Sequence, residues 1–562
     1  MTSPGGPSAV EQTAAGDELA SAVNGAGSGV GSSSVDTASV GTDGLATVGG
    51  REAAAQRPYD VGPIWALLLP PLTALALALW NITTPSYWRD EAATMAAVKR
   101  PFGDLVSMLG NVDAVHGAYY IMMWPVAHFF GTGELVMRLP SALAAAVTAA
   151  FVAAIGRRLI SPWVGLAAGL LLAILPVTAR YGQEARSYGM VMGLATIASY
   201  LLMRACNAES ARRRRWFVGY GAGLAALGIM NIFGLLLIPA HAVTLALRYR
   251  RLRGSQDARR LAVGWLAATV AGVVVSGPAL VLGWEQRGQI AWIANTKAPS
   301  PGVALVTLTG SALVTIVIAA VIVIALFVSS EATGARRPAW HWQLTELSLP
   351  WMAVPPVLLL GASVISPIYT SRYILMCIPA VALLGGMALV MLGRVAGPVA
   401  LALALLAGLT IQVTQRQPGG HGDDIRGLDR VVAAHARPGD YVLYTNPNAE
   451  SFSAAYSYGL GKLPDIAIMA GANASGTLAG TSVGSAALRA RLEHAKRVWV
   501  VEINHCLSEP LMQKLNAVKL GPALAGLPLT FVKIWHERAD WVLLYKHGVG
   551  SQATTTACVG HT

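Results

Sequence analysis

The feature that most constrains this chain is a series of apolar segments, separated by short clusters of arginine. Apolar side chains make up 54% of the 562 residues and charged ones 12%, about half the charged share of a soluble domain. Because about 20 apolar residues in a helix cross the hydrocarbon core of a bilayer, the pattern predicts a polytopic α-helical membrane protein with about eleven spans. The spans are expected at 63–80, 139–155, 162–178, 186–203, 216–247 (a hairpin broken near Asn231), 261–282, 303–328, 347–365, 373–392 and 395–411.

The arginine clusters predict how the chain is oriented in a plasma membrane. They lie between the apolar segments, and cytoplasmic loops of membrane proteins are enriched in lysine and arginine. We therefore expect a cytoplasmic N-terminus and, after an odd number of spans, an extracytoplasmic C-terminus. The segment 119–130 is too short for a comfortable crossing and is expected to form an interfacial helix on the outer side. The net charge of +12 is spread over these inner loops, so no nucleic-acid partner is predicted. The clusters are Arg157-Arg158, Arg212 to Arg215, Arg248 to Arg260 and Arg336-Arg337.

Composition divides the chain into three regions. Residues 1–57 are rich in Gly, Ala, Ser and Thr, which predicts a disordered cytoplasmic tail. Residues 58–414 form the membrane domain, with an outer loop at 81–118 after the first span. Residues 415–562 have the composition of a soluble domain.

The C-terminal region alternates short strands with helices, which predicts an extracytoplasmic α/β domain. A disulfide between Cys506 and Cys558 is permitted outside the cytoplasm, and two free thiols are equally compatible with the sequence. Strands are expected at 441–444, 498–501, 531–535 and 541–545, and helices at 424–435, 486–496 and 509–518.

Two adjacent acids, Asp90 and Glu91, stand in the first outer loop of a chain that otherwise avoids charge. Ionisable groups held near a membrane are functional candidates, and a carboxylate can act as a general base. The alternative is that both acids only stabilise the N-terminus of a helix that begins near Ala92. His116 lies in the same loop beside Tyr119 and Tyr120, where an aromatic belt at the membrane boundary is the alternative to a functional histidine.

Two arginines are expected on the same outer face as the acids. Arg186 opens a helix together with Tyr188, and Arg372 precedes Tyr373. A guanidinium suits a phosphate or a carboxylate, whereas the structural alternative is an arginine that snorkels from a helix end. Cations for a lipid-linked phosphate and a carboxylate for an acceptor hydroxyl would together serve group transfer. The His and Cys residues show no metal-ligand spacing, so no cofactor is predicted, although a divalent cation would be compatible with these acids.

At these residues the chain resembles the polyprenyl-phosphate-dependent GT-C glycosyltransferases of the protein O-mannosyltransferase-like superfamily. The resemblance covers most of 63–412. It implies a GT-C fold, a polyprenyl-phosphate-sugar donor drawn from the membrane lipid, and an inverting single displacement on the outer face. The matching pieces are Trp88-Arg89-Asp90-Glu91, His116 to Tyr120, Arg138-Leu139-Pro140, Gln183 to Tyr188 and Arg372-Tyr373.

The same resemblance implies roles for individual residues. Asp90 would be the base and Glu91 its supporting acid, while Arg186 and Arg372 are candidates for binding the donor phosphate. The remaining substrate-binding candidates are Arg138, His116, Tyr188 and Tyr373. Many relatives have His-Pro-Pro where this chain has His116-Gly117-Ala118, and this departure leaves the role of His116 open.

The Ala-, Gly- and Arg-rich composition is similar to that of a high-GC actinobacterium, where enzymes of this type resemble mannosyltransferases that extend or cap lipoglycans such as lipoarabinomannan. We therefore expect mannose as the sugar, arabinofuranose as the alternative, and a cell-envelope glycan or lipoglycan as the acceptor. A transporter would favour inverted repeats with polar groups near the midplane, whereas here the polar groups gather at one face. A scaffold with an inert anchor would not need so many spans.

Overall fold

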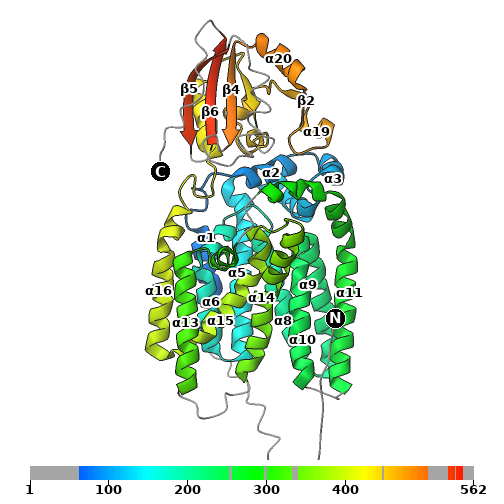
Figure 1. The fold of residues 1–562 in the computed structure, drawn as a ribbon, viewed down its shortest axis with the longest axis vertical. Coiled ribbons are helices and arrows are strands. Elements are labelled where there is room, and N and C mark those ends of the chain that lie inside the picture. Colours follow the sequence, from blue (N-terminus) through cyan, green and yellow to red (C-terminus); the bar gives the residue numbers. More distant parts are fainter. Residues whose placement is uncertain are drawn as a thin grey trace, which may run out of the picture. The chain divides into compact units, whose positions relative to one another are not determined.

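Long helices that run side by side make up most of the protein in this computed structural model (Figure 1). The structure describes residues 63–251, 256–295, 300–331, 340–445, 449–503, 529–537 and 540–547. The expected tail at 1–57, the helix at 509–518 and the cysteines at 506 and 558 lie outside these residues.

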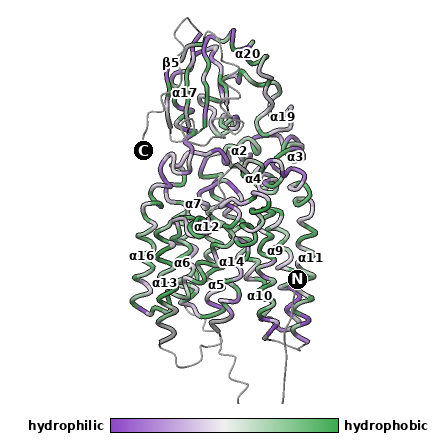
Figure 2. Tube along the Cα trace, in the orientation of Figure 1, coloured by the Kyte–Doolittle hydropathy of each residue, from purple (hydrophilic) through white to green (hydrophobic). Residues whose placement is uncertain are grey.

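Apolar residues run along the middle of the long helices, and hydrophilic residues gather where the end of α10 adjoins the start of α11 (Figure 2). In the described part of the chain, seven helices are long and apolar enough to cross a membrane, or up to nine if two bent pairs each count as one span. The polytopic membrane fold is thereby confirmed, and the expected count of about eleven spans stays a prediction. The helices of the bundle, of which some are shorter than a full span, are α1 (Trp65–Leu79), α5 (Glu134–Leu159), α6 (Pro162–Ile174), α8 (Tyr188–Cys206), α9 (Ser210–Met230), α10 (Leu237–Arg251), α11 (Gln256–Glu285), α13 (Ala312–Glu331), α14 (Trp340–Ile365), α15 (Ile378–Met391) and α16 (Gly393–Thr414).

Two of the predicted spans are bent. Helix α6 meets α7 (Pro176–Gly182) at 65°, and α12 (Pro301–Thr307) meets α13 at 90°. The second bend interrupts the single helix expected at 303–328. Gly310 in the break has a φ of +81°, and a Cβ there would lie 2.6 Å from the backbone nitrogen of Val177. Only glycine adopts this conformation readily and leaves room for the neighbouring chain.

Three short helices lie across one end of the long ones (Figure 1). They are α2 (Arg89–Val98), α3 (Phe102–Asn111) and α4 (Gly117–Phe130), with a 3-10 turn, η2 (Ala114–His116), before α4. The short helix expected at 119–130 is present as α4. The loop predicted after the first span is therefore mostly helical.

The C-terminal region contains a four-stranded sheet. Within the described residues, every strand and helix that the sequence predicts here is present. The order of the strands is β1-β4-β6-β5, with β1 parallel to β4 and the other neighbours antiparallel. A pair of short antiparallel strands, β2 (Ile468–Ala470) and β3 (Thr481–Ser482), stands apart. The sheet strands are β1 (Tyr441–Tyr444), β4 (Arg497–Ile503), β5 (Leu529–Glu537) and β6 (Asp540–His547), and the helices are α17 (Ile425–His435) and α20 (Ser485–Glu493).

The segment that leads into this region fixes the start of α2. The buried carboxylate of Asp423 accepts hydrogen bonds from the backbone N–H of Arg89 at 2.8 Å and from its guanidinium at 2.9 and 2.7 Å. At the other end of α2, Arg100 donates to the backbone oxygens of Ala472 and Leu478. Both ends of the helix that carries the acidic pair are therefore tied to residues after 415.

Candidate active site

Asp90 and Glu91 occupy the first turn of α2, and they point into different surroundings because neighbouring residues on an α-helix are about 100° apart. Glu91 is fully buried. Its carboxylate accepts hydrogen bonds from the guanidinium of Arg138 at 2.8 and 2.7 Å and from the backbone N–H of Ala185 at 2.8 Å. Burial alone would raise the pKa of Glu91, but Arg138 outweighs it and holds that pKa far below its usual range. Glu91 is therefore a buried anion that joins three segments.

Arg138 is not available to a substrate, which corrects the expectation that it binds one. Its side chain is fully buried. Besides Glu91, it donates to the backbone oxygens of Ile82 and Pro85, both at 2.8 Å, and of Ser86 at 3.0 Å. These bonds use all the N–H groups of the guanidinium. The arginine therefore holds the end of the first span against α2.

Asp90 stands at the accessible side of the same turn, where its carboxylate forms an ion pair with Arg372. The two side chains are 17% and 22% exposed, so solvent or a ligand can reach both. Burial would raise the pKa of Asp90, but Arg372, Arg186 and His116 together lower it below its usual range. Asp90 is therefore ionised at neutral pH.

Arg186 brings a second cation to this carboxylate. It is 5% exposed, and one of its terminal nitrogens donates to the Tyr120 hydroxyl at 2.8 Å. That hydroxyl in turn donates to Asp113. The Nε–H of Arg186 has no hydrogen-bond partner among the residues that the structure describes. Since an unpaired buried donor is costly, this N–H is a candidate for binding an anionic ligand.

His116 and the two tyrosines from the sequence prediction line the same site. The His116 ring lies 6.5 Å from the ring of Tyr188, and Tyr188 lies 6.0 Å from the guanidinium of Arg372. Tyr373 stacks on Phe233 with ring centroids 3.9 Å apart. Burial and the charge of Arg186 lower the pKa of His116 to about 4, so this histidine is neutral at pH 7. Together with Asp90, Arg186 and Arg372, these residues form one cluster.

The structure adds Arg180 and Glu184, to which the sequence analysis gave no role. The guanidinium of Arg180 lies 5.2 Å from the centre of the Trp88 ring, and that of Arg372 lies 5.5 Å from it. Arg180 also pairs with Glu184 at 2.8 Å. The spacing of these two residues, four apart in a segment already placed on the outer face, is the signal that could have identified them.

Among the described residues, no group of three or more His, Cys, Asp or Glu side chains is placed to hold a metal ion.

Comparisons with known proteins show similarity over part of the sequence and over the fold. Residues 117–280 match the family described as dolichyl-phosphate-mannose-protein mannosyltransferase. A sequence search among curated proteins finds no match. The fold is similar to that of ArnT from Cupriavidus metallidurans in the apo state, with a TM-score of 0.55, 13% identity, and coverage of 85% of this chain and 97% of that one.

The same enzyme bound to undecaprenyl phosphate matches with a TM-score of 0.55 and 14% identity over 87% of this chain and 99% of that chain. The oligosaccharyltransferase of Archaeoglobus fulgidus in complex with zinc and sulfate matches with a TM-score of 0.50 and 11% identity, over 86% of this chain and 73% of that one. The chain therefore has the fold of the GT-C membrane glycosyltransferases, as the sequence predicts, and its residues 117–280 share the sequence pattern of the mannosyltransferase family.

Proposed function

We propose that the protein is an integral-membrane glycosyltransferase that moves a sugar, mannose in the first place, from polyprenyl phosphate to a cell-envelope glycan or lipoglycan. The observation that carries this proposal is the accessible carboxylate of Asp90, ionised and held between Arg372 and Arg186. The family match over 117–280 supports mannose. The similar fold of an enzyme bound to undecaprenyl phosphate supports a lipid-phosphate donor.

In this proposal the arginines bind the phosphate of the donor. Among the described residues, the partly exposed Arg372 forms an ion pair with Asp90 alone, and the Nε–H of Arg186 has no hydrogen-bond partner. Guanidinium groups match the oxygens of a phosphate in geometry and charge. When the phosphate takes over these cations, the pKa of Asp90 rises, since the charges that depress it are neutralised. The base thus becomes stronger at the moment when the donor is in place.

Asp90 then acts as the general base in a single displacement. Its carboxylate takes the proton of the acceptor hydroxyl while that oxygen forms a bond to the anomeric carbon. The bond from this carbon to the phosphate oxygen breaks, and its electron pair stays on the phosphate, where Arg372 and Arg186 stabilise the added charge. The sugar is thereby joined to the acceptor with inverted configuration at its anomeric carbon, and polyprenyl phosphate is the second product.

Arg372→Gln is expected to reduce kcat/KM for the donor roughly ten- to hundredfold, since a hydrogen bond to a charged group contributes about 1.5–3 kcal/mol. The loss of this cation also raises the pKa of Asp90. Activity needs the ionised base and disappears as pH falls through that pKa, so the acid limb of the pH profile moves to higher pH. Donor kinetics of the variant and the wild type, followed from pH 8 down to about pH 3, measure both effects. An exposed arginine, Arg287, provides the control as Arg287→Gln, and an unchanged acid limb in Arg372→Gln would contradict the pairing with Asp90.

The raised pKa of Glu184 predicts that donor binding also changes with pH. Burial raises the pKa of Glu184 to about 6; Arg180 opposes the shift, and the charges of Glu91 and Asp90 add to it. Below pH 6 the neutral Glu184 releases Arg180, which then adds its charge to the phosphate site. We expect KM for the donor to fall severalfold between pH 7.5 and 5.5, and Glu184→Gln to keep the low value throughout. A KM in Glu184→Gln that still changes with pH as in the wild type would assign the effect to another group.

The proposed activity is tested with the purified full chain in liposomes, radiolabelled polyprenyl-phosphate-mannose and an extracted lipoglycan acceptor. Transfer of label to the acceptor supports the proposal. A parallel reaction with polyprenyl-phosphate-arabinofuranose decides the sugar, because transfer of arabinose alone would contradict mannose and keep the rest of the mechanism. If the folded protein transferred neither sugar to any envelope glycan, the proposed function would be wrong.

A further inference from the structure

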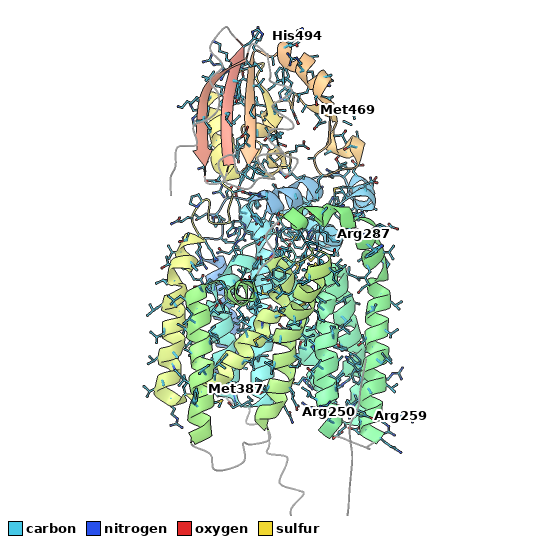
Figure 3. All side chains as sticks on the ribbon, in the orientation of Figure 1. Arg250, Arg259, Arg287, Met387, Met469 and His494 are labelled. Carbon is cyan, nitrogen blue, oxygen red and sulfur yellow. The ribbon has the colours of Figure 1, made fainter. Side chains whose placement is uncertain are left out.

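A groove of about 350 Å³ lies between α10 and α11, at the end of these helices that faces away from the candidate active site. Helix α11 has 30 residues and is therefore about 45 Å long. Just beyond its last residue, the Gln286 side chain forms hydrogen bonds with the backbone of Leu109 on α3 and of Ala114 in η2. The first residues of α11 and the last residues of α10 line the groove. Figure 3 shows Arg250 and Arg259 at this end and Arg287 at the other.

The walls of the groove are apolar and its mouth is basic. Leu245 and Leu261 line it together with Trp265, and the indole N–H of Trp265 is already donated to the Tyr220 hydroxyl at 3.1 Å. Arg248 and Arg250 line the groove on the last turns of α10. A ligand with an apolar body and an anionic head matches this division.

Basic side chains outnumber acidic ones around the mouth in the part of the chain that the structure describes. Asp257, in the first turn of α11, is bound by the guanidinium of Arg213 at 2.6 and 3.1 Å. Arg259 and Arg260 follow it with exposed side chains. Arg250 is exposed as well, whereas Arg248 donates to the backbone oxygen of Cys206 and to the Asn207 side chain. The basic side of such a helical bundle faces the cytoplasmic leaflet, which carries anionic lipid.

We propose that this groove binds an anionic phospholipid of the cytoplasmic leaflet, with its phosphate at Arg250 and Arg248 and an acyl chain along Trp265 and Leu261. The apolar wall lies within helices long enough to cross the membrane, and the cations lie where the headgroups begin. Basic pockets between spanning helices bind acidic lipid headgroups in this way. The site is independent of sugar transfer.

The test uses the full chain in liposomes of phosphatidylcholine with a trace of photoreactive phosphatidylglycerol. After illumination, we expect labelled peptides from 245–251 and 256–265, and we expect excess phosphatidylglycerol, but not excess phosphatidylcholine, to suppress the labelling. Arg250→Gln should lower this labelling about fivefold, since one basic residue near an anionic lipid contributes about a factor of that size. Arg250→Lys should keep most of it.

Arg287→Gln is the matched control, because Arg287 lies at the opposite end of α11 and contacts Trp284. Its labelling at 245–265 should equal that of the wild type. Equal suppression by phosphatidylcholine would overturn the proposal. So would full labelling in Arg250→Gln, provided that its thermal unfolding midpoint shows a folded protein.

Discussion

Asp90→Asn is expected to lower kcat about a thousandfold, because a positioned general base contributes roughly 10²–10⁴ in rate. Asparagine keeps the size of the side chain and loses the group that accepts the proton. It also releases Arg372 from its ion pair, so KM for the donor should stay the same or fall. A loss confined to kcat distinguishes the missing base from a damaged binding site. Transfer kinetics in liposomes with the purified variant measure both constants.

Asp104→Asn is the control for this substitution, since Asp104 lies on the neighbouring helix α3 and outside the cluster around Asp90. It should transfer sugar at the wild-type rate. An Asp90→Asn variant that folds normally and keeps more than about a tenth of the wild-type kcat would be incompatible with general-base catalysis by Asp90.

Glu91→Gln is expected to destabilise the protein by about 3–5 kcal/mol, because it leaves the buried charge of Arg138 without a partner. The corresponding change in a pair whose acid is exposed is the control. Asp257 accepts two hydrogen bonds from Arg213, just as Glu91 accepts two from Arg138. The side chain of Asp257, however, is 48% exposed. Asp257→Asn should therefore cost less than about 1 kcal/mol. Thermal and denaturant unfolding of the two variants in the same detergent measure the difference.

The activity of Glu91→Gln shows whether Glu91 only positions α2 or takes part in proton transfer. If Glu91 only holds α2 against Arg138 and Ala185, the activity of Glu91→Gln follows the folded fraction and recovers on cooling. A kcat per folded molecule as low as that of Asp90→Asn would instead give Glu91 a direct part in the reaction. The fully buried carboxylate and its surrounding N–H donors favour the first result.

The membrane fold could be predicted from the sequence because its signals are local. The apolar segments identify the helices of the bundle, and Asn231 ends α9 where the hairpin was expected to break. The right-angle bend after α12 was missed, since the apolar run continues through it and its cause lies in the distant Val177 that packs on Gly310. The local sequence of the bent segment does not reveal a contact with a residue so far away in the chain.

The site was only partly accessible to sequence reasoning for the same reason. Asp90, Arg186 and Arg372 could be assigned to one face from topology, and the structure brings them together. Arg138 was expected to bind a substrate, but all its N–H groups donate to atoms of the protein itself. These partners come from distant parts of the chain, so the sequence around Arg138 does not reveal them. The residues just after 415 were assigned by composition to a separate domain, yet Asp423 holds the start of α2.

The most direct test of the central claim, a single displacement on a polyprenyl-phosphate donor, is the anomeric configuration of the product. The purified wild-type protein in liposomes receives β-linked polyprenyl-phosphate-mannose and the glycan acceptor, and the product is examined by NMR. The mechanism predicts an α-mannoside, with polyprenyl phosphate released in an equal amount. A β-mannoside, or donor left intact by folded protein in the presence of the acceptor, would contradict it.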